Sequence, residues 1–483
     1  MTSRRLLIVG VAALALLTGC KAVGPNFAPP PAPNETGYLM QGDAAPAVAR
    51  MAPVDRAAGA WWTAFGSADL DKVMDEALAG NQTIAQANAN LARMQELAAV
   101  AHAAQLPQAD LNAGLTGERI NLTSFGFSGF PGLSISNPTL GLYSVGANVS
   151  YDTDVFGGLR RGTEAARARA ESQARQADAA YLTLTGQTAM AALQIATYRA
   201  ELAADQAAVD DDQRLIDIVN KAENAGGEAP SASVSVKAQL AQDLAALPPV
   251  RTQLAQARHA LAQLVGQAPA DWTAPDFDLA GFTAPADVPV ALPSTLVRRR
   301  PDILAAEADL HTATAQVGVA DAALYPDIRL TANITQTALP PANLFSYSAT
   351  GWTLASGLTY PLFHGGALKA EKRAAIDAAN AAEARYRATV LAAFTQVADV
   401  MAALAEDDAE LAALQAAQNT AQSALTDDET ALKLGGGALL PVMDDQRRLQ
   451  LARRAMAGAE GKRLADLATL YVATASDWRE AKS

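Results

Sequence analysis

Few residues in this chain have the types and spacing that catalysis or metal binding requires. The 483 residues include one cysteine, Cys20, which excludes an intramolecular disulfide, a zinc cluster and an iron–sulfur site. Four histidines, His102, His259, His311 and His364, are scattered without a second ligand at helix-face spacing. We find no phosphate-binding loop, dinucleotide fingerprint or serine–histidine–aspartate order. We therefore expect no enzymatic activity and no metal or organic cofactor.

The position of Cys20 indicates a covalent lipid. Two arginines precede a 12-residue apolar run, residues 6–17, as in a secretory signal peptide, and 12 residues are too few to span a bilayer as a helix. The residues that follow, Thr18-Gly19-Cys20, complete a match to the bacterial lipobox, in which the cysteine is cut free and acylated. We expect residues 1–19 to be removed; the alternative is an ordinary signal peptide and an incidental cysteine. Lys21 in place of aspartate is compatible with passage to an outer membrane.

Composition and charge narrow the fold and the partners. Half of the residues are apolar but only 5% are aromatic, and alanine supplies most of the apolar share, which favours closely packed helices. The net charge of −13 disfavours a nucleic-acid partner, which needs a basic face. Proline is frequent in residues 23–53, which predicts an extended tether wrapped along the body or strung beneath the lipid.

The chain repeats one order of motifs. Phe156-Gly157-Gly158 recurs as Phe363-His364-Gly365-Gly366, an offset of 207 residues, and Ala225-Gly226-Gly227 recurs as Leu434-Gly435-Gly436, an offset of 209. Each half is predicted to be a helix, two strands, a long helix, a break and further helix. We accordingly divide the mature chain into residues 20–66, a first repeat at 67–266, a linker at 267–300 and a second repeat at 301–483.

Four segments alternate apolar and polar residues with period two. They span about 108–122, 141–155, 327–338 and 351–362. This is typical of transmembrane barrel strands, although soluble half-buried hairpins share it; the export signal and the aromatic residues near strand ends favour the membrane. Four strands cannot close a barrel, since the smallest have about eight. Several chains must therefore pool strands, and two, three or four copies all remain possible.

The predicted helices are too long for a globular core. Residues 159–225 and 367–434 contain no proline and would each extend roughly 100 Å as helix. Shorter helices are predicted at about 70–105, 231–247, 249–265, 302–324 and 440–474. Pro248-Pro249 is expected to break the chain between two of these. A sustained leucine heptad is absent, which favours packing on two sides, as in a tube wall, over a free coiled coil.

Five motifs, in order along the chain, carry a family resemblance. They are Cys20 with Val23-Gly24-Pro25-Asn26-Phe27; residues 61–65, WWTAF; Leu247-Pro248-Pro249 leading to Arg258-His259-Ala260-Leu261; residues 292–303, LPSTLVRRRPDI; and residues 440–447. With these the chain resembles the TolC-like outer-membrane factors of Gram-negative bacteria, most closely the NodT/OprM-like lipoprotein branch that serves resistance-nodulation-division efflux systems.

The resemblance implies a mainly α-helical chain with a transmembrane β-barrel. Three copies would close a 12-stranded barrel in the outer membrane, continued by a helical tunnel in the periplasm and a mixed equatorial girdle near Trp61-Trp62, residues 267–300 and the C-terminus. It also implies turns from strand to tunnel helix at Gly157, Gly158, Gly365 and Gly366. The hairpin tips, Ala225, Gly226 and Gly227 with Gly435, Gly436 and Gly437, would then dock a periplasmic adaptor.

The resemblance further implies a gate at the periplasmic aperture. In the family, a Leu-x-x-x-Asp motif past the second hairpin places both side chains one helical turn apart, in constricting rings, and Leu440 and Asp444 match it. The chain departs from the family in having Pro441 and Asp445; the second acid would strengthen the ring or face water. The alternative is that both aspartates only favour the helix dipole. Acid clusters at 210–212, 407–408 and 427–428 are interpreted as solvated faces.

We therefore expect a passive, trimeric exit duct in the outer membrane that carries drugs or other small molecules. It would work with an inner-membrane resistance-nodulation-division pump, a periplasmic adaptor and outer-membrane lipids, with the lipid on Cys20 as its only covalent group. Two alternatives stay open: the exit duct of a type I protein secretion system, and a structural periplasmic lipoprotein without a pore.

Overall fold

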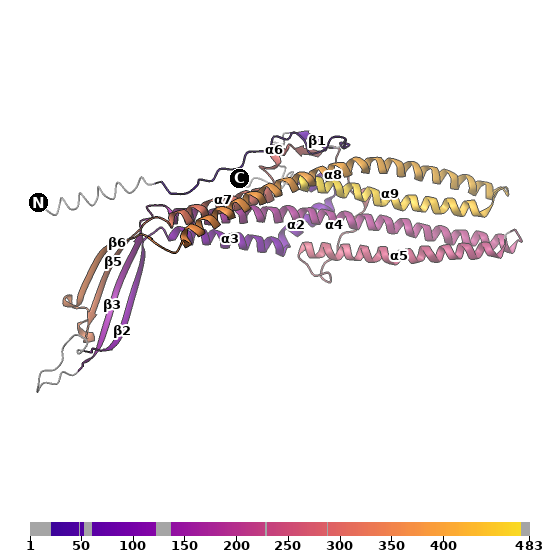
Figure 1. Cartoon of the computed structure of the whole chain (residues 1–483). Coiled ribbons are helices and arrows are strands. Elements are labelled where there is room, and N and C mark those ends of the chain that lie inside the picture. The colour runs from indigo at the N-terminus through magenta and orange to yellow at the C-terminus, as the bar shows by residue number, and fades with distance from the viewer. Residues whose placement is uncertain are drawn as a thin grey trace, which may run out of the picture. The chain divides into compact units, whose positions relative to one another are not determined.

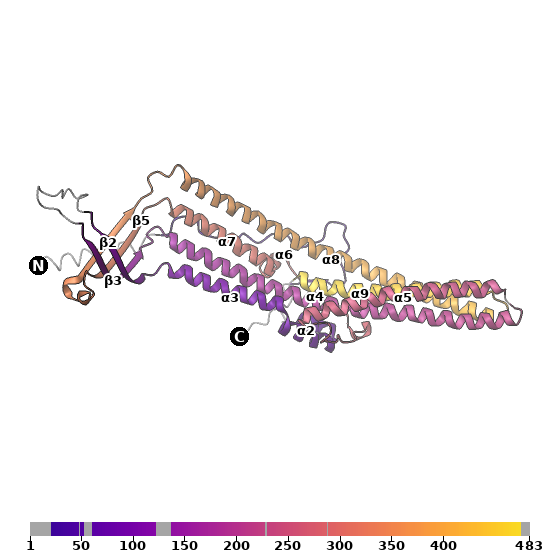
Figure 2. The ribbon, with the colours of Figure 1, turned by 90° about the horizontal axis from the view of Figure 1, so that it is seen from below.

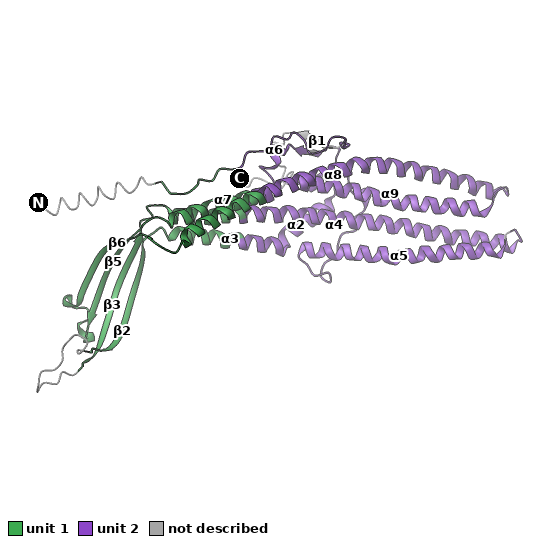
Figure 3. Ribbon diagram, in the orientation of Figure 1, with its two compact units in different colours: residues 1–29, 91–172, 306–385 green, residues 30–90, 173–305, 386–483 purple. Residues whose placement is uncertain are grey.

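A computed structural model of the chain (Figure 1) describes residues 21–47, 49–52, 60–121, 137–227, 229–286 and 288–474. The predicted signal peptide and its cysteine, Cys20, lie outside these residues. The chain divides into two compact units (Figure 3). Unit 1 comprises residues 1–29, 91–172 and 306–385, and unit 2 comprises residues 30–90, 173–305 and 386–483. Each unit is described by itself below.

Unit 1 contains one four-stranded antiparallel sheet (Figure 2). Its strands are β2 (Gln108–Arg119), β3 (Thr139–Asp152), β5 (Asp327–Ala338) and β6 (Thr350–Thr359). Their order in the sheet is β2-β3-β5-β6, and every neighbouring pair is antiparallel. Each strand end lies within three residues of the range predicted from period two. Within the described chain, β2 and β6 are edge strands with one unpaired side each.

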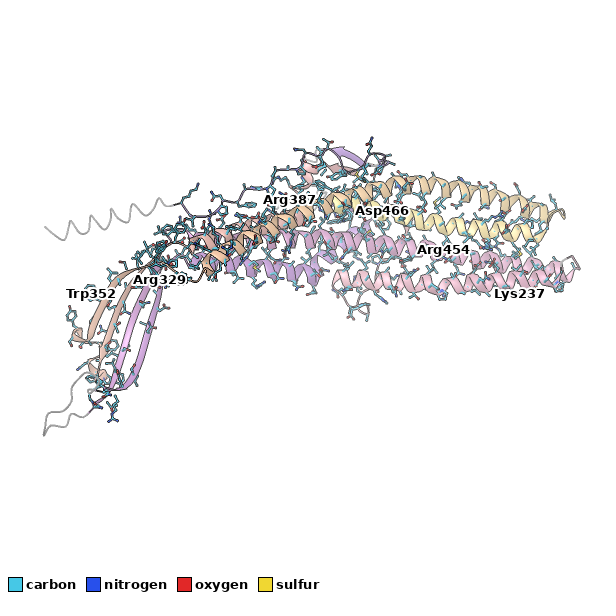
Figure 4. All side chains as sticks on the ribbon, in the orientation of Figure 1. Lys237, Arg329, Trp352, Arg387, Arg454 and Asp466 are labelled. Carbon is cyan, nitrogen blue, oxygen red and sulfur yellow. The ribbon has the colours of Figure 1, made fainter. Side chains whose placement is uncertain are left out.

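The strand register places apolar side chains in rows across one face of this sheet. Leu111 pairs with Ala147, Ala147 with Ile334, and Ile334 with Trp352, so one row crosses all four strands. Trp352 projects freely from β6 and is 77% exposed (Figure 4). The next row holds Asn112, Gly146, Thr335 and Gly351 and belongs to the opposite face. One chain therefore exposes a sheet that is apolar on one face and polar on the other.

The N-terminal segment is fixed onto the helices of unit 1. These helices are α7 (Pro301–Ala322), the first turns of α4 (Gly158–Asn224) and α8 (Ala367–Lys433), and the end of α3 (Gln82–Ala103). Arg161 is buried and donates from Nε to the Val23 carbonyl oxygen at 3.1 Å and from Nη2 to Asn26 Oδ1 at 2.8 Å. Phe27 stacks on His311 with ring centroids 4.3 Å apart. This part of the proline-rich stretch is therefore wrapped along the body.

Unit 2 contains most of the helical mass. The two longest helices, α4 and α8, each have 67 residues. Each is followed by an antiparallel partner, α5 (Pro230–Val265) after α4 and α9 (Leu439–Ala473) after α8. Unit 2 also holds α2 (Ala68–Gly80), the short α6 (Pro293–Leu296) and a parallel pair of strands, β1 (Ala49–Ala52) with β4 (Val288–Ala291). The chain is thus mainly helical with one four-stranded sheet, which confirms the predicted fold class.

One predicted helix, residues 70–105, is two helices. Asn81 has extended backbone, with ψ 124°, and separates α2 from α3. Its Oδ1 accepts hydrogen bonds from the Thr83 and Ile84 backbone N–H groups at 2.8 and 3.2 Å, which caps α3. Its Nδ2 donates to the Leu264 carbonyl oxygen of α5 at 2.8 Å. The break is therefore held by both a cap and a tertiary contact.

The prediction of a break at Pro248-Pro249 is wrong, because α5 continues through both prolines. The missing N–H groups leave the carbonyl oxygens of Leu244 and Ala245 without helical partners. Both residues are exposed, so water can take up these oxygens. Leu247 and Val250 are buried on either side, which holds the helix on its neighbours.

Helices α4 and α9 pack antiparallel with a constant register. A Cβ atom on Gly186 of α4 would lie 2.8 Å from Val472 Cγ2, and a Cβ on Gly461 of α9 would lie 1.9 Å from Thr197 Oγ1. The two contacts are 11 residues apart on both helices, which is three turns. Further along, Arg454 donates to Asp205 at 3.3 Å. Glycine is favoured at these contacts because the facing Val472 and Thr197 side chains occupy the space that a Cβ atom would need.

Candidate functional site

The two helix hairpins of unit 2 end in the same backbone motif. After α4, the Gly226 N–H donates to the Glu223 carbonyl oxygen and the Gly227 N–H to that of Ala222; after α8, Gly435 and Gly436 donate in the same way to Leu432 and Ala431. Gly226 and Gly435 adopt φ of 77° and 80°, as in a Schellman cap. The tip residues are exposed in both hairpins, namely Ala225, Gly226, Gly227, Gly435 and Gly436, and Gly437 is half-buried. The predicted tips are therefore tight, accessible turns.

The four glycines predicted between strands and helices lie at those junctions in unit 1. Gly158 is the first residue of α4, while Gly365 and Gly366 immediately precede α8 and are exposed. Gly157 is buried, adopts φ 82°, and a Cβ there would lie 2.4 Å from the Cβ of Ala22. The turn after β3 therefore depends on glycine for its conformation and for its contact with the N-terminal segment.

The predicted gate residues begin α9. Leu440 is 75% exposed, and Asp444, one turn later, has a side chain that is 54% exposed. Pro441 falls in the first turn of the helix, where its missing N–H costs no hydrogen bond. Leu440 and Asp444 therefore share one accessible face of α9.

Asp445 faces the protein. It is 6% exposed and accepts a hydrogen bond from Arg448 Nη1 at 3.0 Å, while Arg448 Nη2 donates to Asp444 at 2.7 Å. Asp428 of α8 lies within hydrogen-bonding reach of Asp445; desolvation first, and then the Asp445 carboxyl, raises the pKa of Asp428. The expectation that Asp445 faces water is therefore wrong, because the side chain is enclosed by α8 and by Arg448. That it strengthens a ring formed by several copies stays a prediction.

A cavity of about 730 Å³ adjoins these residues. Its wall includes Leu440, Asp444 and Asp445 of α9, Asp428 of α8 and Asp212 of α4. Arg447 and Arg448 also line it. The site is acidic overall, with its exposed acid, Asp444, partly neutralised by an arginine one turn away.

The interpretation of the acid clusters as solvated faces is partly wrong. Asp210 and Asp427 are exposed as expected, but Asp212 and Asp407 are only 3% and 2% exposed. Asp407 accepts a hydrogen bond from Lys462 of α9, and this bond raises the pKa of Lys462. Burial and then the neighbouring Asp407 carboxyl raise the pKa of Asp466 to about 6.

Sequence reasoning missed Arg448 and the buried aspartates. The spacing of Asp444 and Arg448, four residues on one helix, is a signal that predicts an ion pair. No local signal distinguishes Asp212 from its exposed neighbours, because its burial depends on helices that are distant in sequence. No group of three or more histidine, cysteine, aspartate or glutamate side chains in the described ranges could hold a metal ion.

Comparisons with known proteins agree with this architecture. A family model described as outer membrane efflux protein matches residues 73–267 and 292–476. Nodulation protein T of Rhizobium leguminosarum bv. trifolii is 28% identical over 454 residues, covering 92% of this chain and 91% of that protein. The pyoverdine export outer membrane protein OpmQ of Pseudomonas aeruginosa is 28% identical over 471 residues, covering 96% and 97%.

A solved structure of the outer-membrane channel OprN superimposes with a TM-score of 0.84 at 23% identity, covering 94% of this chain and 99% of that one. At this identity the likeness establishes a shared fold. The matches span nearly the whole chain, so both units belong to one architecture.

Proposed function

The chain belongs to the outer membrane efflux protein family and is an outer-membrane protein, and from this we propose that it is the passive exit duct of a tripartite efflux pump. In this proposal three copies pool their sheets into one 12-stranded barrel, and their long helices form a tunnel in the periplasm. Drugs or other small molecules would leave through it, driven by an inner-membrane resistance-nodulation-division pump and coupled by a periplasmic adaptor.

The observation that carries this proposal is the open, one-sided sheet of unit 1. Among the described residues its edge strands β2 and β6 have no strand partner on one side, and a bilayer does not tolerate unpaired backbone N–H and C=O groups. Its apolar face, with Leu111, Ile334 and Trp352, suits lipid, and its polar face suits a water-filled lumen. A further copy must pair with each edge, and the family resemblance selects three copies.

The periplasmic aperture would be closed by Leu440 and Asp444. Their shared exposed face allows three copies to meet around an axis, with Arg448 moderating the charge of Asp444. The tips, Ala225 to Gly227 and Gly435 to Gly437, are exposed except at Gly437, and would offer the adaptor two equivalent turns of small residues. The duct itself needs no energy source.

Conductance in planar bilayers tests the aperture. We expect the double variant Leu440→Ala with Asp444→Ala to raise single-channel conductance, because it removes both constricting side chains. The matched control, Leu434→Ala with Asp427→Ala, changes an exposed leucine just after α8 and an exposed aspartate in its last turns. Unchanged conductance in the first variant would contradict the gate.

Two further outcomes separate the alternatives. A protein that forms no heat-modifiable trimer and no ion-conducting pore would be a structural lipoprotein. A protein that conducts, but restores secretion of a polypeptide and not drug resistance in a duct-deficient strain, would serve type I secretion.

We also propose that Cys20 carries the lipid. Ala22, two residues later, is described and lies against Gly157 in the turn between β3 and α4. Metabolic labelling with palmitate should mark the wild-type protein and not Cys20→Ser. Labelling that persists in Cys20→Ser would refute the assignment.

A further inference from the structure

Two carboxyl groups face each other inside the first hairpin. Asp212 of α4 and Asp243 of α5 lie within hydrogen-bonding reach, and Asp212 is 3% exposed. Asp212 Oδ2 is buried and receives no hydrogen bond from any donor in the part of the chain that the structure describes. A buried oxygen that accepts no hydrogen bond destabilises the folded state. A proton between the two carboxyl groups would remove this destabilisation.

Asp243 cannot supply that proton when it is ionised. Its two oxygens already accept hydrogen bonds from Gln239 Nε2 at 3.1 and 3.2 Å. Two facing carboxylates are both acceptors and repel each other. A proton on Asp212 turns that repulsion into a hydrogen bond donated to Asp243.

The charged groups around the pair do not remove the need for this proton. On α4, Asp211 lies beside Asp212 and is paired with Arg214. Asp205 lies two helical turns before Asp212 on α4 and forms an ion pair with Arg454 of α9. The cavity wall contributes Asp428 of α8 and, from α9, Asp444, Asp445, Arg447 and Arg448. Arg448 is occupied by the two aspartates of α9, and no ion pair to Asp212 is found among the described residues.

The second hairpin has a different arrangement. There Asp407 of α8 faces Asp466 of α9, but Lys462 donates to Asp407 and compensates one charge. The first hairpin has no lysine in the equivalent place; its nearby Lys237 donates to Ser233 at 3.3 Å. The two hairpins therefore differ in how they hold a buried acid pair.

We propose that Asp212 and Asp243 form a binding site for a single proton, and that this proton clamps α4 to α5 on the wall of the aperture cavity. Burial first, and then the neighbouring Asp243 carboxyl, raises the pKa of Asp212 to about 7. The proton is therefore held in an acidic periplasm and lost in an alkaline one. The proton site stands on its own; its influence on the aperture rests on the proposed function.

Hydrogen–deuterium exchange on the full-length trimer in detergent tests the clamp. With a pKa of about 7 in the closed hairpin and 3.8 in an opened one, the equilibrium constant for opening should rise about tenfold from pH 6 to pH 8. The readout is the exchange of residues 205–219 and 236–250, divided by that of unstructured peptides at the same pH.

Two variants and a control assign the effect to this pair. Asp212→Asn supplies an amide N–H to Asp243 at every pH, and Asp243→Asn supplies one to Asp212, so each should abolish the tenfold change. Asp217→Asn, an exposed aspartate on the same helix, should retain it. A change in wild type below twofold, or one that survives in Asp212→Asn, would overturn the proposal. Protection at pH 8 that requires added Mg²⁺ would assign the pair to a cation and also overturn it.

Conductance then separates this inference from the proposed function. If hydrogen–deuterium exchange depends on pH as expected but the protein forms no pore, the proton site is supported and the proposed duct function is refuted. In a conducting trimer, we expect conductance to rise from pH 6 to pH 8 in wild type and to stay constant in Asp212→Asn. A conducting trimer whose wild-type conductance is independent of pH would refute control of the aperture by the clamp.

Discussion

Replacing Gly461 of α9 with alanine tests how closely α9 is fitted to α4. The new Cβ would lie 1.9 Å from Thr197 Oγ1 and 2.8 Å from both Thr197 Cβ and Cγ2. Rotation of Thr197 could move Oγ1, which now donates to the Leu193 carbonyl oxygen at 2.8 Å, but it cannot move Cβ. The two helices must therefore separate for the alanine to fit.

The size of the effect follows from two opposing contributions. Alanine in place of glycine in a helix interior gains about 1 kcal/mol. Overpacking of a close contact costs about 1–3 kcal/mol, and loss of the Thr197 hydrogen bond costs about 1 kcal/mol. We expect a net destabilisation of about 1–3 kcal/mol. Gly458, one turn earlier, is the matched control: its Cβ would lie 3.4 Å from the flexible end of Glu201, so Gly458→Ala should be neutral or stabilising.

Thermal unfolding in detergent, followed by circular dichroism at fixed protein concentration, measures the difference. At about 2 °C per kcal/mol for a large unit, Gly461→Ala should unfold about 2–6 °C below wild type, and Gly458→Ala at or above it. Thr197→Gly should recover part of the loss in Gly461→Ala, because it removes all three atoms near the new Cβ. Equal midpoints for the two alanine variants would refute the close fit of α4 and α9.

Three other changes test the N-terminal segment, the second acid pair and the sheet. Arg161→Ala should make residues 21–29 susceptible to limited proteolysis, because it removes charge-assisted hydrogen bonds that stabilise the attachment of this segment by about 3 kcal/mol. Arg169→Ala, at an exposed position, should leave the segment protected. Asp466 has a pKa of about 6 in the folded protein, above its unfolded value of 3.8, so its protonated form is favoured by folding. Wild type should therefore lose about 1–3 kcal/mol more stability in denaturant than Asp466→Asn as pH rises from 4 to 6. Above pH 6 the difference between the two proteins should change little, because the remaining dependence on pH comes from other groups such as Asp212. Leu354→Arg on the apolar face of β6 should lower trimer stability by about 2–4 kcal/mol if that face meets lipid, and Thr353→Arg on the other face should have a much smaller effect; equal effects would count against a barrel.

Local sequence patterns predicted the strands and the long helices, because the period and the proline content of a segment determine its secondary structure without distant partners. Period two located β5 at its observed bounds, and the absence of proline between residues 159 and 225 predicted α4 to within one residue at each end. The shared cap at Gly226 and Gly435 follows from glycine placement alone. These features need no knowledge of distant partners.

Features that depend on neighbours could not be predicted. Pro248 and Pro249 are tolerated because Leu244 and Ala245 are exposed, which is set by helices packed elsewhere. Asp212 differs from Asp210 only in facing α5, where Asp243 lies 31 residues later in the chain. Arg161 has no local feature that identifies it as the residue holding Val23 and Asn26.

The register of α4 with α9 also has a consequence for how the proposed aperture would move. Sliding α9 along α4 would bring larger side chains against each other in place of Gly461 and Gly186, so these contacts resist sliding. A rotation of α9 about this close contact is the motion that remains. From Gly461 to Leu440, α9 is an unbroken lever arm of roughly 30 Å at 1.5 Å per residue. A pivot of about 5° at this contact carries Leu440 through about 3 Å at the end of such an arm. A small angular change deep in the helical body is therefore enough to widen or narrow an opening at its far end.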